Sequence, residues 1–494
     1  MNQMREVRLR RGLPRWAIAA AALSAASLVP LSVAAHDDDD DVRPAVRPPD
    51  GERVRPQRPE RELREILRDV DRRNVEAIIR KLVSFGTRHT LSSQTDPNRG
   101  IGAATTWVYQ TLQGYAAAAN GRMNVQIDSF TQPPGPRNPN PVVVNSVVAT
   151  LTGSVTPNRV YIISGHLDSR VTDVLNFDAE EPGADDDASG VAVVMEVARV
   201  MAQHKPESTL VFAVVAGEEQ GLFGSTHIAA NMAAAHTDIQ GMFSNDIVGS
   251  STAENGVRDP HLLRLFTEGV PTTLTPAPGG VLTPTQSLQL QLLELVGGEN
   301  DSASRQLGRF VKSVADNEDT DMNIWLLFRR DRYLRSSDQA SFASLGYPAA
   351  RFTEPNENFA HEHQDVRVEN GVQFGDLIDF VDFAYVARVA KVNAATLWSL
   401  SQGPGTPKNA QIVAIVLTNS TTMTWNADTD PDIAGYEIVW RDTSEPDWTH
   451  AIPVGNVTTA TLPIAPKDNF QLGVRAVDKD GHRSPVAFPA TKFQ

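Results

Sequence analysis

Between about residues 61 and 400, short apolar runs alternate with helical patterns, and this alternation limits the fold more than any other feature of the sequence. The runs are apolar at consecutive positions, as expected of strands buried on both faces. Ser189 to Gln203 instead repeats valines at helical spacing. Interleaved strands and helices predict an α/β fold with a mostly parallel mixed sheet covered by helices on both faces. The runs are Val142 to Leu151, Val160 to Ser164, Leu210 to Ala216 and Ala349 to Phe352.

Other segments divide the chain further. Residues 36–60 carry the aspartate run Asp37 to Asp41 and then alternate Pro with Arg, which predicts a disordered linker because such a segment cannot bury a core. We expect the α/β domain over residues 61–400 and a short linker over 401–408. Residues 409–494 show period-two strands separated by turn residues, which predicts a small all-β sandwich domain.

Residues 1–35 have the pattern of a secretory signal peptide. An arginine-containing start precedes an Ala/Leu-rich run from Trp16 to Ala35. Pro30 and the small residues at the end of this run favour a cleaved signal over a membrane anchor. We therefore expect cleavage after Ala35, export to the periplasm or the extracellular space, and no stable membrane span after cleavage.

Composition excludes several classes of function. The 494 residues include no cysteine, which excludes disulfides, thiolate metal sites and cysteine nucleophiles. The formal net charge of −15 leaves no basic surplus for a phosphate backbone, so we expect no nucleic-acid partner. Any metal would be bound by His, Asp and Glu, which suit zinc or manganese.

Two of the predicted strands are followed directly by acidic or histidine side chains. His166 follows the strand that begins at Val160, and Asp168 is close enough to accept the other imidazole N–H and fix its tautomer. Glu218 and Glu219 follow the buried run that starts at Leu210. Two carboxylates there cannot both remain unpaired anions, so one would bind a metal while its neighbour moves protons.

Three more groups complete this pattern. Asp185 to Asp187 directly precede the predicted helix, where adjacent aspartates are costly without a cation, although acids also cap helices. Asp246 lies in an otherwise apolar strand, and His361 and His363 follow the last strand. Each group alone has an ordinary structural explanation. One side chain from each of the five groups would supply two histidines and three carboxylates, suitable for two zinc ions that share one carboxylate and one hydroxide.

These motifs occur in the order found in a known enzyme family. They are His166-Leu167-Asp168-Ser169, Gly183 to Gly190, Gly217-Glu218-Glu219-Gln220-Gly221-Leu222-Phe223-Gly224-Ser225, Asn245-Asp246 and His361-Glu362-His363-Gln364-Asp365. Over roughly residues 75 to 395 the chain resembles the secreted di-zinc aminopeptidases, the bacterial leucyl-type zinc aminopeptidases. The resemblance implies a zinc peptidase α/β sandwich, two Zn²⁺ ions per chain, and cleavage of N-terminal peptide bonds in peptide or protein substrates.

The resemblance also implies a role for each residue. His166 and Asp246 would bind one zinc, Glu219 and His361 the other, and Asp186 would bridge the two ions.

Glu218 would be the general base that takes a proton from water and passes it to the leaving amine, and Asp168 would orient His166. His361 is preferred to His363 because the family's ligand lies four residues before the aspartate that matches Asp365.

One position departs from the family pattern. Some members have a tyrosine directly before the last histidine to stabilise the oxyanion, whereas this chain has Ala360, with Tyr333 and Tyr347 as substitute candidates. The same architecture also occurs in carboxypeptidases, amidases and glutaminyl cyclases, which stay as alternatives. A non-catalytic binding or adhesion protein is a further alternative, disfavoured by the intact Glu218.

The C-terminal segment resembles a fibronectin type III domain. Trp425, Tyr436, Leu462 and the run Phe470 to Asp478 occupy positions where that fold has its core, which makes Trp425 a packing residue. Phe470 stands at the usual tyrosine-corner position. The resemblance leaves open whether the domain binds surfaces, binds substrate or spaces the enzyme.

Overall fold

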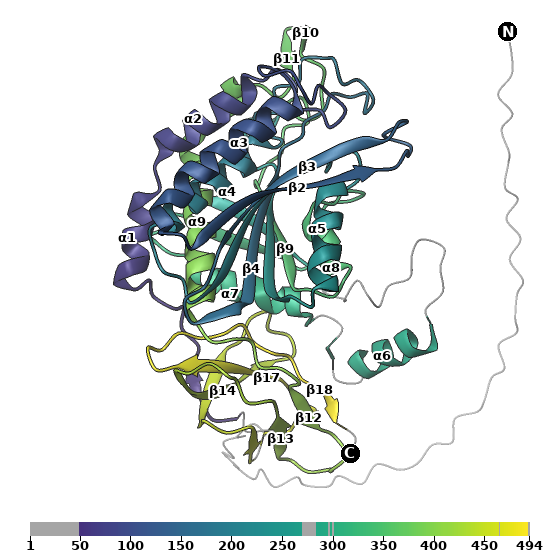
Figure 1. Cartoon of the computed structure of the whole chain (residues 1–494). Helices are drawn as coiled ribbons and strands as arrows, with labels where there is room; N and C mark the ends of the chain where they lie inside the picture. The colour runs from purple at the N-terminus through teal and green to yellow at the C-terminus, as the bar shows by residue number, and fades with distance from the viewer. Residues whose placement is uncertain (1–48, 269–282, 295–296, 299–300, 464, 493–494) are drawn as a thin grey trace, which may run out of the picture. The chain divides into compact units, whose positions relative to one another are not determined.

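The computed structural model describes residues 49–268, 283–294, 297–298, 301–463 and 465–492. An eight-stranded sheet with helices on both faces is followed by two four-stranded sheets (Figure 1). The expected α/β class and the separate all-β part are confirmed. The expected signal peptide, residues 1–35, and most of the expected linker lie outside the described residues.

The large sheet has the strand order β2-β3-β5-β4-β6-β9-β7-β8. Its centre, β5-β4-β6-β9, is parallel throughout, whereas β2–β3, β3–β5 and β7–β9 pair antiparallel. β7 and β8 also pair parallel at one edge, so the sheet is mixed with a parallel centre. The strands are β2 (Met123–Gln132), β3 (Val142–Leu151), β4 (Thr156–His166), β5 (Ser208–Val215), β6 (Asp238–Asn245), β7 (Leu262–Thr267), β8 (Asn323–Leu327) and β9 (Ala349–Thr353).

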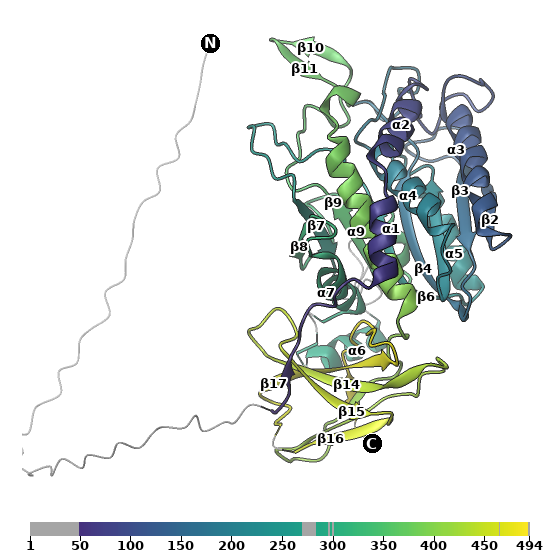
Figure 2. The ribbon, with the colours of Figure 1, turned by 90° about the vertical axis from the view of Figure 1, so that its left-hand side faces the viewer.

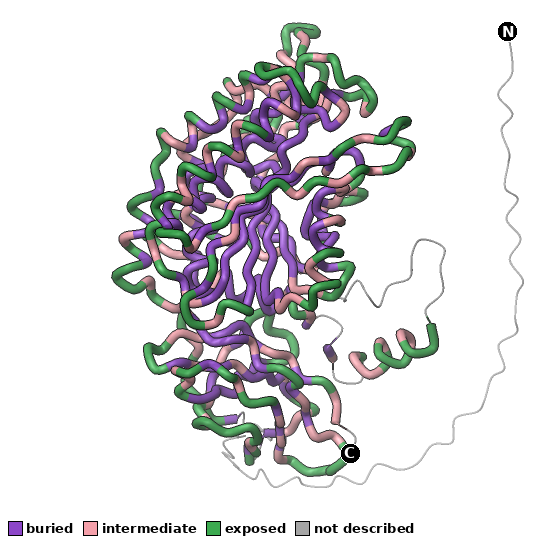
Figure 3. The backbone as a smooth tube through the Cα atoms, in the orientation of Figure 1, coloured by how far each residue is buried: buried purple, intermediate pink, exposed green. Residues whose placement is uncertain are grey.

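The central strands are buried on both faces, because alternate side chains enter two separate cores. On β5, Phe212 packs with one core and Val211 with the other. In the described part of the chain, six helices cover the first face, and α5 (Phe223–Ala234) with α8 (Gln339–Ala343) covers the second, which leaves the buried strands between them (Figures 1 and 3). The six are α1 (Arg61–Asp69), α2 (Arg72–Val83), α3 (Ile101–Ala116), α4 (Ala188–Met201), α7 (Ala303–Ala315) and α9 (Phe383–Gln402).

Helix α4 begins next to the end of β4 because two glycines face each other there. A Cβ on Gly165 would lie 2.5 Å from the backbone carbon of Gly190, so only glycine allows this approach. Asp187 caps the helix by accepting from Gly190 N–H, and its other oxygen accepts from His166 N–H. The first turn of α4 is thereby fixed against the end of β4.

The C-terminal part consists of the sheets β1-β15-β14-β17 and β16-β13-β12-β18. Trp425 and Tyr436 are buried in the core between them, so Trp425 is a packing residue. The strands are β12 (Gln411–Val413), β13 (Thr421–Thr424), β14 (Ile433–Asp442), β15 (His450–Gly455), β16 (Thr459–Leu462), β17 (Phe470–Asp478) and β18 (Ala490–Lys492). Helix α6 (Pro284–Glu294) and a separate two-stranded sheet, β10 (Arg367–Glu369) with β11 (Val372–Phe374), lie outside these sheets.

The part of the expected linker that the structure describes contains a short strand. β1 (Glu52–Arg53) pairs antiparallel with β15 (Figure 2). In addition, Trp440 Nε1 donates to the carbonyl of Asp50 at 3.0 Å. Backbone hydrogen bonds to an open sheet edge require no apolar side chains, so a segment that cannot form a core can still add a strand. The linker expectation therefore fails for residues 50–53.

None of the helices in the described residues combines the length and the apolarity that a membrane crossing requires.

Candidate metal centre

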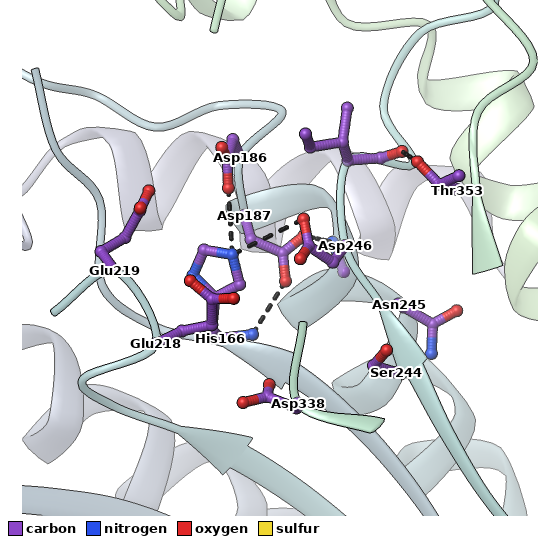
Figure 4. A network of polar contacts seen from close by, with 12 residues as sticks. His166, Asp186, Asp187, Glu218, Glu219, Ser244, Asn245, Asp246, Asp338 and Thr353 are labelled. Atoms are coloured by element: carbon purple, nitrogen blue, oxygen red, sulfur yellow. Dashed lines mark hydrogen bonds and ion pairs between the residues drawn. The ribbon is translucent and has the colours of Figure 1, made fainter. Parts of the chain in front are cut away.

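Residues from four segments meet at the carboxyl ends of the central parallel strands (Figure 4). His166 is the last residue of β4, Glu218 and Glu219 follow β5, and Asp246 follows β6. Asp186 comes from the loop that leads into α4. Parallel strands bring their carboxyl ends to one edge of a sheet, which is why residues distant in the chain converge here.

The first cluster consists of His166, Asp186 and Asp246, and all three are buried. His166 Nε2 lies 3.0 Å from Asp186 Oδ1 and 3.7 Å from Asp246 Oδ1. One candidate ligand atom from each residue lies within 4.8 Å of the others. This spacing suits three ligands of one cation.

The second cluster consists of Asp186, Glu219 and His363. His363 Nε2 lies 2.7 Å from Asp186 Oδ2 and 2.9 Å from Glu219 Oε1. Asp186 therefore belongs to both clusters, with one oxygen in each. Asp186 Oδ1 and Glu219 Oε1 are buried and accept no hydrogen bond, so both atoms are available to a cation.

The structure corrects the choice between the two histidines of the last loop. The ring of His361 stacks on Phe380 with centroids 3.5 Å apart and lies outside both clusters, whereas His363 lies in the second. His363 has a φ of 52°, which turns the chain sharply at this point. In such an irregular loop, spacing to Asp365 does not determine which side chain points inward. The expectation that His361 is the ligand therefore disagrees with the structure, which places His363 in the cluster.

The carboxylate of Asp168 does not orient His166, contrary to the expectation from the sequence. Its side chain lies 3.8 Å from His166 Nδ1, and that nitrogen instead contacts the backbone carbonyl of Asp168 at 2.9 Å. The carboxylate accepts from the N–H groups of residues 217, 218 and 219 and from the Thr90 hydroxyl. Asp168 thus fixes the loop that carries Glu218 and Glu219, while its own backbone orients His166.

Glu218 lies beside His166 and belongs to neither cluster (Figure 4). Burial raises the pKa of Glu218 well above its ordinary value. His166 lowers this pKa, whereas the nearby carboxylates of Asp246 and Glu219 raise it further. A carboxyl group of this kind can hold a proton near neutral pH and exchange it.

Two carboxylates of the clusters, Asp246 and Asp186, have lowered pKa values, in contrast to Glu218. The pKa of Asp246 is lowered despite its burial, because the Arg351 guanidinium contacts it at 3.0 Å. The pKa of Asp186 is held well below its ordinary value against burial by His363 and His166. Both groups therefore remain carboxylates, the form that binds cations.

Several supporting residues have no recognisable motif. Asp376 accepts from the N–H groups of Asp185 and Asp186, both at 2.8 Å, and Arg170 contacts Glu219 and His363. Arg351 alone left a signal in the sequence, because it is a charged residue inside the buried strand β9. Such a residue requires a partner, and it has two, Asp246 and Asp331.

Of the two tyrosines considered as oxyanion donors, Tyr333 is 83% exposed beneath Arg329, and Tyr347 packs against the core under α5 and α8.

Comparison with known proteins gives a family and close relatives. The model of peptidase family M28 matches residues 146–274. A "Probable zinc metalloprotease" of the fungus Pyrenophora teres f. teres is 49% identical over 434 residues, covering 88% of each chain. Another from Pyricularia oryzae is 47% identical and covers 89% of this chain and 87% of its own.

Solved structures are more distant. The Legionella pneumophila LapA aminopeptidase is 19% identical with a TM-score of 0.47, covering 69% of this chain and 75% of its own. Porphyromonas gingivalis glutaminyl cyclase is 16% identical with a TM-score of 0.41, covering 66% of this chain and 97% of its own. Both TM-scores are below 0.5, so neither protein discriminates between the two activities for this chain.

Proposed function

The chain belongs to peptidase family M28, and on that premise we propose that it is an exported zinc aminopeptidase with two metal sites and Glu218 as its general base. The observation that carries the proposal is the position of Asp186, which directs Oδ1 to His166 and Oδ2 to His363. A carboxylate between two three-residue clusters is the arrangement that a bridging ligand requires.

The donor set fits zinc. Each cluster offers one histidine nitrogen and carboxylate oxygens from two residues, with no sulfur ligand, and two of these oxygens are buried without a hydrogen bond. His166 and Asp246 would hold one ion, Glu219 and His363 the other, and Asp186 both. When bound, the ions would polarise the substrate carbonyl and lower the pKa of the attacking water.

Other side chains transfer the proton and support the ligands. Glu218 takes the proton of the attacking water and later donates it to the leaving amine. Asp168 holds the backbone of residues 217–219, which keeps Glu218 and Glu219 in place. Arg351 keeps Asp246 charged.

The proposal includes a preference for substrates with a free N-terminus. Two clusters, rather than one, favour a two-metal peptidase over a glutaminyl cyclase. The test is zinc analysis of the purified protein together with hydrolysis of an aminoacyl anilide and of the same substrate with a blocked amine. Two zinc ions with cleavage of only the free-amine substrate support the proposal. Cleavage of the blocked substrate at an equal rate contradicts the aminopeptidase assignment, and one ion per chain contradicts the two-metal mechanism.

Export and the nature of the C-terminal domain are separate proposals. Export is supported by the arginine-containing start and the apolar run that ends at Ala35, and N-terminal sequencing of the secreted protein would locate the cut. A fibronectin type III-like C-terminal domain is supported by its two four-stranded sheets around Trp425 and Tyr436. Pull-down of cell-wall or protein substrates with variants lacking or keeping this domain would test whether it binds them.

A further inference from the structure

Arg170 contacts both of the side chains that belong only to the second cluster. Its Nε donates to Glu219 Oε2 at 2.6 Å and its Nη2 donates to His363 Nδ1 at 2.7 Å. These are the outer atoms, because Glu219 Oε1 and His363 Nε2 face each other across the cluster at 2.9 Å. Arg170 therefore lies behind the two ligands and outside the space that a cation would occupy.

The first cluster also has an arginine, but there the charge is compensated. Arg351 contacts Asp246 at 3.0 Å and Asp331 at 3.0 Å, and it is fully buried. Among the described residues, Arg170 forms an ion pair with Glu219 alone, and its remaining contact is the Val171 carbonyl. The second cluster thus carries a guanidinium charge that only its own ligand offsets.

We propose that Arg170 is a positioning residue that holds Glu219 in place, and His363 only while the cluster is empty, and that it lowers the affinity of the cluster for its cation. The two clusters then fill in order, with His166, Asp186 and Asp246 binding the first ion. This inference rests on the proposed two-metal function.

Two physical effects lead to the lower affinity. A guanidinium behind the ligands repels a dication in a buried site, where screening by water is weak. In addition, a neutral histidine that binds a cation through Nε2 carries its proton on Nδ1. Arg170 now donates to that same Nδ1, so occupancy of the second cluster requires Arg170 to move away from His363.

Arg170 has room for this movement. Its side chain is 15% exposed, whereas that of Arg351 is completely buried. Its substitution should also disturb the core little, which makes it suitable for a test.

The experiment is a zinc titration of metal-stripped protein in competition with a chromophoric chelator, for the wild type and for Arg170→Gln. We expect two binding steps in the wild type. Because Arg170→Gln removes a repelling charge, we expect it to strengthen only the weaker step, by about tenfold. His363→Ala should remove the weaker step and His166→Ala the tighter one, which assigns each step to its cluster. An unchanged or weakened second step in Arg170→Gln would overturn the inference.

Arg137→Gln is the matched control. Arg137 also reaches this loop, but it donates to the backbone carbonyl of Glu219 and touches neither ligand side chain. Both steps should stay within about threefold of the wild type in this variant. A shift equal to that of Arg170→Gln would attribute the effect to general surface charge and overturn the assignment to Arg170. A wild-type protein that binds fewer than two ions would instead contradict the proposed two-metal function.

Discussion

His363 Nε2 lies 2.7 Å from Asp186 Oδ2, and the other oxygen of the same carboxylate lies 3.0 Å from His166 Nε2. Asp186 is held at this position from behind, since Asp376 accepts its backbone N–H at 2.8 Å. A single side chain, from the loop that leads into α4, thereby links the end of β4 to the loop after β9.

The two histidines of the last loop should differ sharply when replaced. His363→Ala removes a ligand of the second cluster, so zinc content should fall from two ions toward one and kcat/KM by at least about 100-fold. His361→Ala removes only the stacking on Phe380 and should keep both ions. Elemental analysis and aminoacyl-anilide hydrolysis measure both effects; the opposite result for the pair would restore His361 as the ligand.

Glu218→Gln should separate metal binding from turnover. Glu218 belongs to neither cluster, so both ions should remain bound. The amide cannot accept the proton of water, so kcat should fall by about 100- to 10,000-fold with little change in KM. Steady-state kinetics with parallel zinc analysis checks this, and wild-type turnover would remove Glu218 from the mechanism.

Asp168→Asn should act through the loop that carries the two glutamates. Both carboxylate oxygens of Asp168 accept hydrogen bonds, so one amide N–H₂ would face a donor. We expect kcat/KM to fall by about 10- to 100-fold. Thr90→Val removes only the hydroxyl donor and should cost less than about tenfold. Equal losses in the two variants would contradict the loop-anchoring role.

The stability of the protein should depend on the charge of His482. Hydrogen bonds to Asp478 and then Glu60 raise the pKa of His482 to about 10, against desolvation. Because the folded-state pKa lies above the ordinary value of 6.5, this contribution is complete below about pH 6.5 and is lost as pH rises toward 10. The difference in unfolding free energy between the wild type and His482→Gln should therefore shrink between pH 6 and pH 10.

Urea denaturation at a series of pH values measures that difference. Asp478→Asn removes the charge of the first partner and should reduce the same pH dependence. If the unfolding free energies of the wild type and His482→Gln change in parallel with pH, His482 does not cause the pH dependence of stability.

The sequence by itself determined the α/β class and the segments that supply the site. The runs at residues 142–151 and 349–352 correspond to β3 and β9, and the helix predicted to start at Ser189 is α4, which starts at Ala188. Strands buried on both faces leave continuous apolar runs, and the acids and histidines that follow them stand out for that reason. The groups that contain His166, Glu219 and Asp246 were identified in this way, whereas Asp186 was chosen within its triplet through the family resemblance. All four residues converge.

Only the tertiary structure decided which atoms face one another. His361 and His363 are equivalent in composition and lie in an irregular loop, where neither period two nor period 3.6 fixes the direction of a side chain. Arg170 and Asp376 act through contacts with residues distant in the chain, and such contacts leave no local pattern. Strand β1 likewise depends on a free sheet edge of β15, which the composition of residues 50–53 does not reveal.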